Sequence, residues 1–218
     1  ALLADKRWAI RNRARKLLGS RGVTPISELQ EILTTSDDRD QRRHAVWALT
    51  QNDHPEARPA VRVALGDEDE TVRQAALHSV SIRRDARANK KLRRLLTSDS
   101  LANRRAAAEA LGRLGDPNAI SDLLVASDDV TDRAVEHSLI FAAIETGTAT
   151  PVRALLRDLR PRVRSAALIA LDQMPSGGIR FADVQMLFGS PNAVLNETAW
   201  WVANQHPEWA GDLADCFQ

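Results

Sequence analysis

The sequence predicts an all-α fold: a right-handed α-solenoid of about seven helical-hairpin repeats, each of about 31 residues. Two observations support this prediction. A short motif centred on alanine recurs along the chain, and no segment shows the apolar–polar alternation that is typical of a strand. Because a single helical hairpin cannot bury its apolar face alone, the repeats are expected to stack on one another.

The motif has an alanine, here called the anchor, in six of seven copies. The anchors are Ala14, Ala45, Ala76, Ala107, Ala167 and Ala199, and a weaker fifth copy places Glu136 at the anchor. Successive anchors are 31, 31, 31, 29, 31 and 32 residues apart. A side chain as small as alanine lets a neighbouring helix approach closely, so the anchors are expected in the core.

Two polar columns accompany the anchor. Three residues before it stands the arginine column: Arg11, Arg42, Arg73, Arg104, Arg133 and Arg164, with Asn196 in the last copy. Six residues further back stand Asp5, Ser36, Asp67, Ser98, Ser127, Asp158 and Ser190, which are residue types that cap helices and turns. We expect each arginine to bond the turn of its own or the adjacent repeat as a structural ladder. An anion-binding ladder is the alternative.

Each copy of the motif predicts a long helix, the second of its hairpin. In the third copy an apolar stripe at helical period runs through Val72, Ala76 and Val80. The first long helix is expected over residues 2–19 and the last short helix over residues 207–217. Shorter helices lie between the long ones, and five of them open at a proline, which suits a first helical turn. These prolines are Pro25, Pro55, Pro117, Pro151 and Pro207.

Residues 1–218 are expected to form one repeat domain. The chain begins with the second helix of a hairpin and ends with a first helix, which favours an excised module of a longer protein. No run approaches 18 apolar residues, so no transmembrane segment is expected. The single cysteine, Cys216, excludes an internal disulfide framework and is expected to be a small buried apolar residue.

The second helices are expected to line the concave surface, which is the usual binding surface of a solenoid. Positions two before, two after and six after the anchor share that side of the helix. The best candidates for binding there are Trp47, His78, Arg105, Glu109, Arg113 and Trp201, because aromatic and arginine side chains dominate binding hot spots. The alternative is that the tryptophans fill gaps between helices. Trp200 is expected in the core, and Trp8 and Trp209 could dock missing neighbours.

No catalytic or metal-binding constellation stands out. His44, His78 and His137 occupy different phases of their helices, and His54 and His206 each precede a proline, where capping or packing is expected. The sequence contains neither HExxH nor a nucleophile elbow. No catalytic residue, metal or cofactor is therefore expected in this chain.

Charge is uneven along the chain. The formal net charge is +1, yet residues 1–115 carry +8 and residues 116–218 carry −7. The densest basic stretch runs from Arg83 to Arg94 and is expected on one short outer helix. It is interpreted either as a solvated helix face or as a surface for an acidic partner.

The fourth copy, LANRRAAAEALGRLGDPNAISDLLVA, resembles the HEAT-like repeats of the phycobilisome-lyase type. The segments HAVWALTQNDHPEAR, TDRAVEHSLIFAAIE and NETAWWVANQHPEWAGDL further resemble the HEAT module of large exported bacterial proteins. Those proteins join a dehydrogenase-like propeller to HEAT repeats and a c-type haem domain. The resemblance implies a scaffold and an exported location. It implies no redox activity here, because the CxxCH motif of covalent haem is absent.

The sequence therefore favours a non-catalytic scaffolding module that binds a protein partner, or flanking domains of the parent chain, through its concave face. One alternative is a nucleic-acid-binding protein like the HEAT-like alkylation-repair DNA glycosylases, which the acidic C-terminal half disfavours. The other is a bilin-lyase-like role, which the shared repeat type allows but no motif supports.

Overall fold

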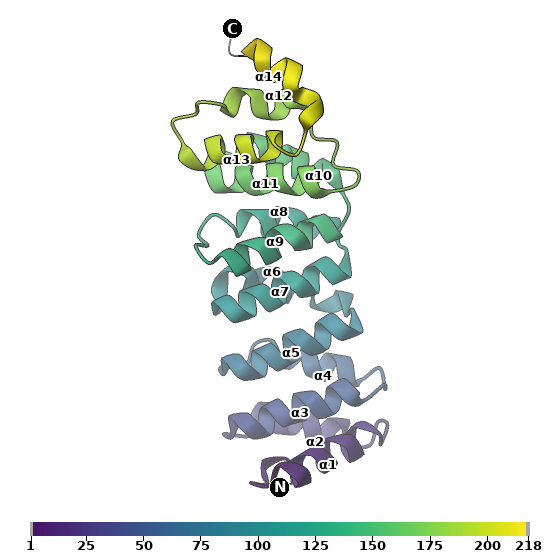
Figure 1. Ribbon diagram of the computed structural model, residues 1–218. Coiled ribbons are helices and arrows are strands. Elements are labelled where there is room, and N and C mark those ends of the chain that lie inside the picture. Colours follow the sequence, from purple (N-terminus) through teal and green to yellow (C-terminus); the bar gives the residue numbers. More distant parts are fainter. Residues whose placement is uncertain (1, 217–218) are drawn as a thin grey trace. The chain divides into compact units, whose positions relative to one another are not determined.

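A computed structural model describes residues 2–216, and every regular element in that range is helical. The all-α prediction is confirmed for this part of the chain. The chain divides into two compact units, Ala1–Ala110 and Leu111–Gln218, and α7 begins in the first and ends in the second. Short and long helices alternate through both units (Figure 1).

The long helices contain the repeated motif. They are α1 (Trp8–Gly19), α3 (Arg39–Gln51), α5 (Glu70–Arg83), α7 (Leu101–Leu114), α9 (Arg133–Glu145), α11 (Pro161–Gln173) and α13 (Ala193–Ala203). The short ones are α2 (Ile26–Thr35), α4 (Ala57–Ala64), α6 (Asn89–Ser98), α8 (Ile120–Val125), α10 (Ala149–Ala154), α12 (Phe181–Val184) and α14 (Ala210–Cys216). Six 3-10 turns complete the order: η1 (Leu2–Ala4), η2 (Ala86–Ala88), η3 (Pro117–Ala119), η4 (Leu155–Arg157), η5 (Gln185–Leu187) and η6 (Pro207–Trp209).

Each unit has two layers of helices. In the first unit α1 packs on α3 and α3 on α5, while α2 and α4 pack on each other and on α3. In the second unit α9 packs on α11 and α11 on α13, with α8, α10 and α12 behind them. The long helices of one unit therefore lie side by side as one layer (Figure 1). The exposed side of that layer is called the long-helix face below.

The anchor alanines lie in the core, as the motif predicts. Five of them, Ala45, Ala76, Ala107, Ala167 and Ala199, are 0% exposed. The long helices begin where side chains satisfy their first backbone N–H groups. Asp38 accepts from the N–H groups of Asp40 and Gln41, and Asp69 from those of Thr71 and Val72.

The fifth copy is the one whose register the sequence analysis placed wrongly. In α3 and α5 the capping aspartate stands seven residues before the anchor. The cap of α9 is Asp132, and seven residues later comes Leu139, which is 0% exposed. Glu136 is only half-buried. The buried anchor of this repeat is therefore Leu139 rather than Glu136.

Glycines at the ends of three long helices support the same correction. Gly22, Gly115 and Gly147 have φ values of 65°, 67° and 67°. They stand eight residues after Ala14, Ala107 and Leu139, respectively. A left-handed residue at this point ends the helix and favours glycine, which has no Cβ. The glycine of α9 shares this position only when its spacing is counted from Leu139 and not from Glu136.

The correction removes two residues from their columns. Glu136 occupies the place of the column arginine in α9, and Arg133 stands in the first turn of that helix, exposed. Ser127 is fully buried and its hydroxyl donates to the carbonyl of Leu124 at 2.6 Å, within its own turn. The fifth repeat therefore departs from the ladder pattern.

Several expectations at the ends of the chain need correction. The first long helix begins at Trp8 and is preceded by η1, and the last begins at Ala210 after η6. Residue 217, where the sequence analysis ended that helix, lies outside the described residues. Cys216 is exposed rather than buried. Trp209 is 8% exposed and packs in the core, whereas Trp8 is 67% exposed.

Two further placements differ from the sequence analysis. The basic stretch does not lie on one helix: Arg83 ends α5, Arg87 lies in η2, and only the residues from Lys90 onward belong to α6. Trp200 is 40% exposed, although its ring packs on Phe188 at a centroid distance of 4.7 Å.

Candidate functional site

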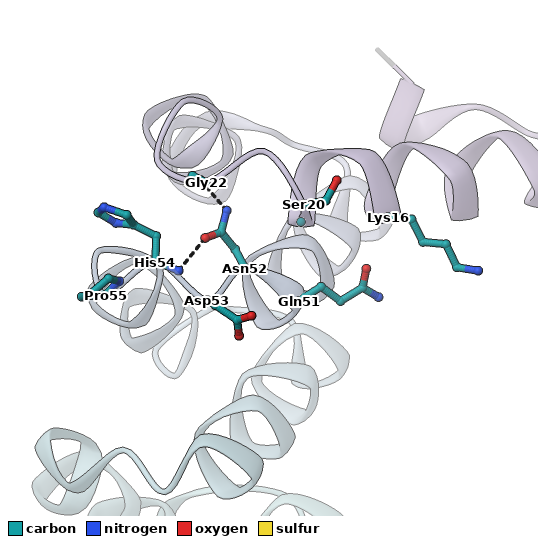
Figure 2. A pocket seen from close by; sticks show the side chains of 9 residues that line it. Lys16, Ser20, Gly22, Gln51, Asn52, Asp53, His54 and Pro55 are labelled. Carbon is teal, nitrogen blue, oxygen red and sulfur yellow. Dashed lines mark hydrogen bonds between the residues drawn. The ribbon is translucent and has the colours of Figure 1, made fainter.

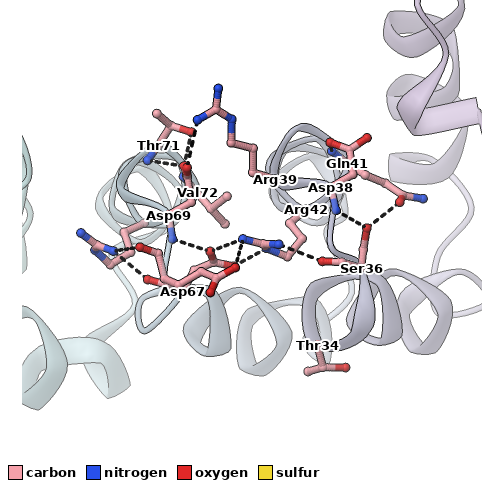
Figure 3. Close-up of polar contacts among 12 residues, drawn as sticks. Thr34, Ser36, Asp38, Arg39, Gln41, Arg42, Asp67, Asp69, Thr71 and Val72 are labelled. Atoms are coloured by element: carbon pink, nitrogen blue, oxygen red, sulfur yellow. Dashed lines mark hydrogen bonds and ion pairs between the residues drawn. The ribbon is translucent and has the colours of Figure 1, made fainter.

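Arg42 illustrates the arginine column (Figure 3). Its Nη1 donates to the carbonyl of Ser36 at 2.8 Å, within the turn of its own repeat. Its Nε and Nη2 donate to the two carboxylate oxygens of Asp67, both at 2.9 Å, in the turn of the next repeat. The hydrogen bonds that the Arg42 guanidinium donates to Asp67 raise its pKa. This buried side chain joins two successive turns.

Arg73 repeats the arrangement one repeat later. Its Nη1 donates to the carbonyl of Asp67 at 2.7 Å. Its Nε and Nη2 donate to the two carboxylate oxygens of Asp99, at 2.7 and 2.6 Å. Burial acts to raise the pKa of Asp99, but hydrogen bonds from Arg73 and the Ser100 N–H outweigh it and lower that pKa. These contacts are those that a stacking role requires.

Two other members of the column also bond backbone carbonyls. Arg11 donates to the carbonyls of Asp5 and Lys6 in its own turn, and Arg104 donates to the carbonyl of Leu96. The Nε of Arg164 is buried and has no hydrogen-bond partner in residues 2–216. Arg42 and Arg73 thus join one turn to the next through the aspartates Asp67 and Asp99.

The long-helix face of the first unit holds four of the predicted binding residues. Trp47 is half-buried, and its ring meets the edge of His78 at a centroid distance of 5.4 Å. Arg105 is paired with Glu109 on the same helix, with Nε and Oε1 3.2 Å apart. The first contact joins α3 to α5, whereas the second lies within α7. They form two separate pairs rather than one cluster.

A groove lies on the long-helix face of the second unit. It has a volume of about 910 Å³ and runs across α9, α11 and α13. Its apolar lining includes Phe141 from α9, Ile169 from α11 and Trp201 from α13. Each stands two residues after its anchor once Leu139 is taken as the anchor of α9. We call these three residues the groove row.

The groove row is accessible although it is apolar. Phe141 is 49% exposed and Trp201 is 42% exposed. The His137 ring stacks on Phe141 with centroids 6.0 Å apart, which holds the phenyl ring in place. Below the row a hydrogen bond of 2.6 Å between the hydroxyls of Ser165 and Thr198 joins α11 to α13. The helices that carry the row are therefore fixed to each other.

Charged side chains line the groove one turn before the row. Glu136 and Glu197 contribute carboxylates that have no ion-pair partner in the described part of the chain. Arg133 and Arg162 stand in the first turns of α9 and α11, and Arg162 donates to the carbonyl of Val130 at 3.0 Å. The groove thus combines an apolar floor with open carboxylates. It can receive an apolar side chain that has a cation next to it.

The sequence analysis found Trp201 in this groove and missed Phe141 and His137. The reason is the register of the fifth copy, since anchoring on Glu136 places Ser138 where Phe141 belongs. The signal that could have found them is the spacing from Asp132 to an apolar anchor, which is the same as in the other capped helices. Arg113, the remaining candidate, is exposed in the last turn of α7.

A second pocket of about 640 Å³ lies where α1 and α3 end (Figure 2). Asn52 bridges it, because its Nδ2 donates to the carbonyl of Gly22 at 2.6 Å and its Oδ1 accepts from the His54 N–H at 2.9 Å. Asp53, which also lines it, is paired with Arg83 at 2.7 Å. These contacts tie successive loops together, so the pocket is interpreted as a structural seam.

Within residues 2–216 no three His, Cys, Asp or Glu side chains gather as a metal ion would require. No helix in that range is both long and apolar enough to cross a bilayer.

Comparison with known proteins identifies the repeat type. The family model for HEAT repeats matches residues 26–105 and 83–144, which together span more than half of the chain. The structure is similar to the complex of CpcE and CpcF of phycocyanin lyase from Nostoc sp. PCC7120. That match has a TM-score of 0.52 and 21% identity, over 94% of this chain and 85% of that chain. At this identity the likeness shows the fold alone.

An engineered protein gives a TM-score of 0.45 at 20% identity, covering 91% of each chain. No curated protein sequence matches the chain. The family match and the fold agree that the chain is an all-helical, solenoid-type repeat protein.

Proposed function

Because this chain belongs to the HEAT-repeat family, we propose that it is a non-catalytic scaffold that binds a protein partner along its long-helix faces. HEAT repeats suggest a protein-interaction role in general terms. The finer proposal is that the groove of the second unit is a main binding surface. The partner is a separate protein or a neighbouring domain of a longer chain.

The observation that carries the proposal is the groove row. Phe141, Ile169 and Trp201 come from three successive helices and leave accessible apolar surface in one groove. Side chains of this kind are core positions of interfaces, where aromatic anchors contribute most of the binding free energy. The other faces of these helices bury their apolar residues. Within residues 2–216, no other element covers this face.

The charged residues beside the groove row indicate which side chains the partner presents there. Glu136 and Glu197 favour a lysine or arginine on the partner, next to the apolar side chain that enters the groove. A partner segment that alternates apolar and basic residues fits this pattern. The N-terminal pairs Trp47–His78 and Arg105–Glu109 are proposed as secondary contacts.

The fold likeness to a phycocyanin lyase complex is compatible with a bilin-lyase-like role as an alternative. It supports that role only through the shared repeat architecture. The nucleic-acid alternative requires a basic groove, whereas this groove is lined by two carboxylates as well as two arginines.

A peptide-display experiment tests the proposal without a known partner. A random peptide library is selected on the wild-type chain and then on the variant Phe141→Ala/Trp201→Ala. We expect enriched peptides that combine an aromatic or aliphatic residue with Lys or Arg, and that bind the double variant at least about tenfold more weakly.

Trp8→Ala is the matched control, because Trp8 is also exposed and lies outside the groove. It should bind the selected peptides like wild type, and both variants should keep the wild-type circular dichroism spectrum. Peptides that bind the double variant as tightly as wild type would contradict the proposal. Tight binding of a short DNA duplex with a steep salt dependence would instead favour the nucleic-acid alternative.

A further inference from the structure

A small basic pocket lies in the first unit, between α4 and the turn that follows α5. Its volume is about 370 Å³, and four arginines line it: Arg58, Arg62, Arg84 and Arg87. The one carboxylate of its lining belongs to Asp85. The pocket uses none of the groove residues, so it is independent of the proposed protein-binding surface.

Hydrogen bonds within the protein compensate the negative charge of the Asp85 carboxylate. Its Oδ2 accepts from Nη1 of Arg62 at 2.5 Å, and its Oδ1 accepts from the backbone N–H of Arg87 at 3.2 Å. Asp85 is 7% exposed, so this ion pair belongs to the floor of the pocket. The pair fixes Arg62 and leaves the other three guanidinium groups as the uncompensated charge of the pocket.

Those three side chains have no carboxylate within ion-pair distance among residues 2–216. Arg58, Arg84 and Arg87 are all exposed, and each lines the same concavity. Three cations held at one opening repel one another unless an anion lies between them. By contrast, the column arginines Arg42 and Arg73 are paired with aspartates.

The backbone at Arg84 gives a second, independent observation. Arg84 has φ 46° and ψ 50°, and it is the one non-glycine residue with positive φ in the described chain. It stands eight residues after its anchor, where α1, α7 and α9 are followed by glycines. Glycine adopts this conformation without steric cost, whereas arginine is strained in it. The repeat thus carries a guanidinium at a place where its own pattern prefers glycine.

We propose that Arg58, Arg84 and Arg87 bind a phosphoryl group, carried by a small soluble phosphate compound or by a lipid headgroup. Guanidinium groups recognise phosphate through paired N–H donors, and three of them match a dianion with three free oxygens. A carboxylate from an acidic protein carries a single charge and two oxygens, and it would leave one arginine unpaired.

Isothermal titration calorimetry with inorganic pyrophosphate at low ionic strength tests the site. We expect saturable binding to the wild-type chain, and a loss of affinity of about tenfold or more in Arg84→Gly. The same substitution should leave the melting temperature at or above that of wild type, since glycine relieves the left-handed backbone. A loss of binding in this variant therefore reports the guanidinium rather than a damaged fold.

Arg94→Ala is the matched control for charge. Arg94 is exposed on α6 within the same basic stretch and does not line the pocket. Its removal should change the affinity less than about twofold, because a screened charge outside the site contributes little. Equal losses in Arg84→Gly and Arg94→Ala would overturn the proposal, as would the absence of saturable binding to both pyrophosphate and vesicles.

Two vesicle preparations distinguish the sources of the phosphoryl group. Phosphatidylcholine vesicles contain either phosphatidic acid, a phosphomonoester, or the same fraction of phosphatidylglycerol, a phosphodiester. Binding that needs phosphatidic acid and that Arg84→Gly abolishes assigns a lipid headgroup. Binding to pyrophosphate without vesicle binding assigns a soluble phosphate compound. Vesicle binding alone, equal for both lipids and unchanged in Arg84→Gly, would contradict the site.

Discussion

At the scale of single residues, the arginine column shows how one side chain can serve two turns. Arg42 and Arg73 each bond a carbonyl of their own turn and a carboxylate of the next. The Asp99 side chain is 1% exposed and the Asp67 side chain 5% exposed. Removing one partner of such a pair leaves a buried charge without compensation, which costs more than the pair contributes.

Arg73→Ala should therefore lower the free energy of unfolding by about 3 kcal/mol, because it strands the Asp99 carboxylate. Urea denaturation followed by circular dichroism measures the loss. Arg133→Ala is the control, and it should stay within about 0.5 kcal/mol of wild type, since Arg133 is exposed and lies outside the corrected column. A melting curve of Arg73→Ala that overlays wild type would contradict the structural ladder.

At the scale of elements, the fifth repeat is the informative case. Helix α9 has an aspartate cap at the same spacing as α3 and α5, and a terminal glycine like α7, but it carries leucine at the anchor. Leucine packs against the neighbouring helices in place of alanine. The groove opens on this helix and its two partners, so the register of α9 decides which side chains face the groove.

Leu139→Ala should destabilise the chain by about 2–5 kcal/mol, because it removes a fully buried side chain and leaves a cavity. Glu136→Ala should change the stability by less than about 0.5 kcal/mol. Thermal unfolding of the two variants compares the two registers directly. A larger loss of stability in Glu136→Ala than in Leu139→Ala would identify Glu136 as the anchor.

His206 links the last described segment of the chain to α11. Its Nε2 lies 2.7 Å from Asp172 at the end of α11, its Nδ1 lies 2.7 Å from Glu208, and its ring stacks on Trp209. Burial acts to lower the His206 pKa, but the hydrogen bonds that its ring makes to Glu208 and Asp172 outweigh burial and raise the pKa above its usual value. The charged imidazolium can donate to both carboxylates, whereas the neutral ring can donate to one.

This raised pKa predicts a pH dependence with a definite sign. A histidine whose pKa is higher in the folded chain stabilises it fully below the unfolded pKa of about 6.5. That stabilisation is lost as pH rises through the folded pKa. Backbone amides of residues 207–216 should therefore exchange faster at pH 8 than at pH 6, after correction for intrinsic rates. In His206→Gln this difference should disappear, and a difference that persists would contradict the role of His206.

At the scale of the whole molecule, stability is expected to be distributed over neighbouring repeats. Each unit has its own buried core, with Leu49, Leu77 and Leu92 in the first and Leu124, Leu168 and Leu171 in the second. In repeat proteins each repeat contacts mainly its neighbours, so the cost of a mutation is local.

Hydrogen exchange measured by mass spectrometry tests this locality. Leu139→Ala should reduce protection mainly in α9 and α11, and Arg73→Ala mainly in α5 and the turn that contains Asp99. Loss of protection over the entire chain in either variant would show a single cooperative unit instead.

The sequence by itself determined the helical class, the repeat and its anchors. A period near 31 residues, small anchors and capping residues act locally, and they fix where helices begin and which side is buried. It also predicted Trp201 on the accessible face, since its phase in α13 follows from the anchor Ala199. Where the motif was weak, in the fifth copy, local pattern allowed two registers three residues apart.

Only the tertiary structure decided between those registers, because burial against neighbouring helices selects Leu139 over Glu136. It also brought Phe141, Ile169 and Trp201 into one groove, and Arg58, Arg84 and Arg87 into one pocket. Both clusters join residues from separate elements, and their meeting depends on how those elements pack. Cys216 and Trp209 show the same limit. Their exposure depends on which residues the last helix covers, and the spacing of residues along the chain does not determine this.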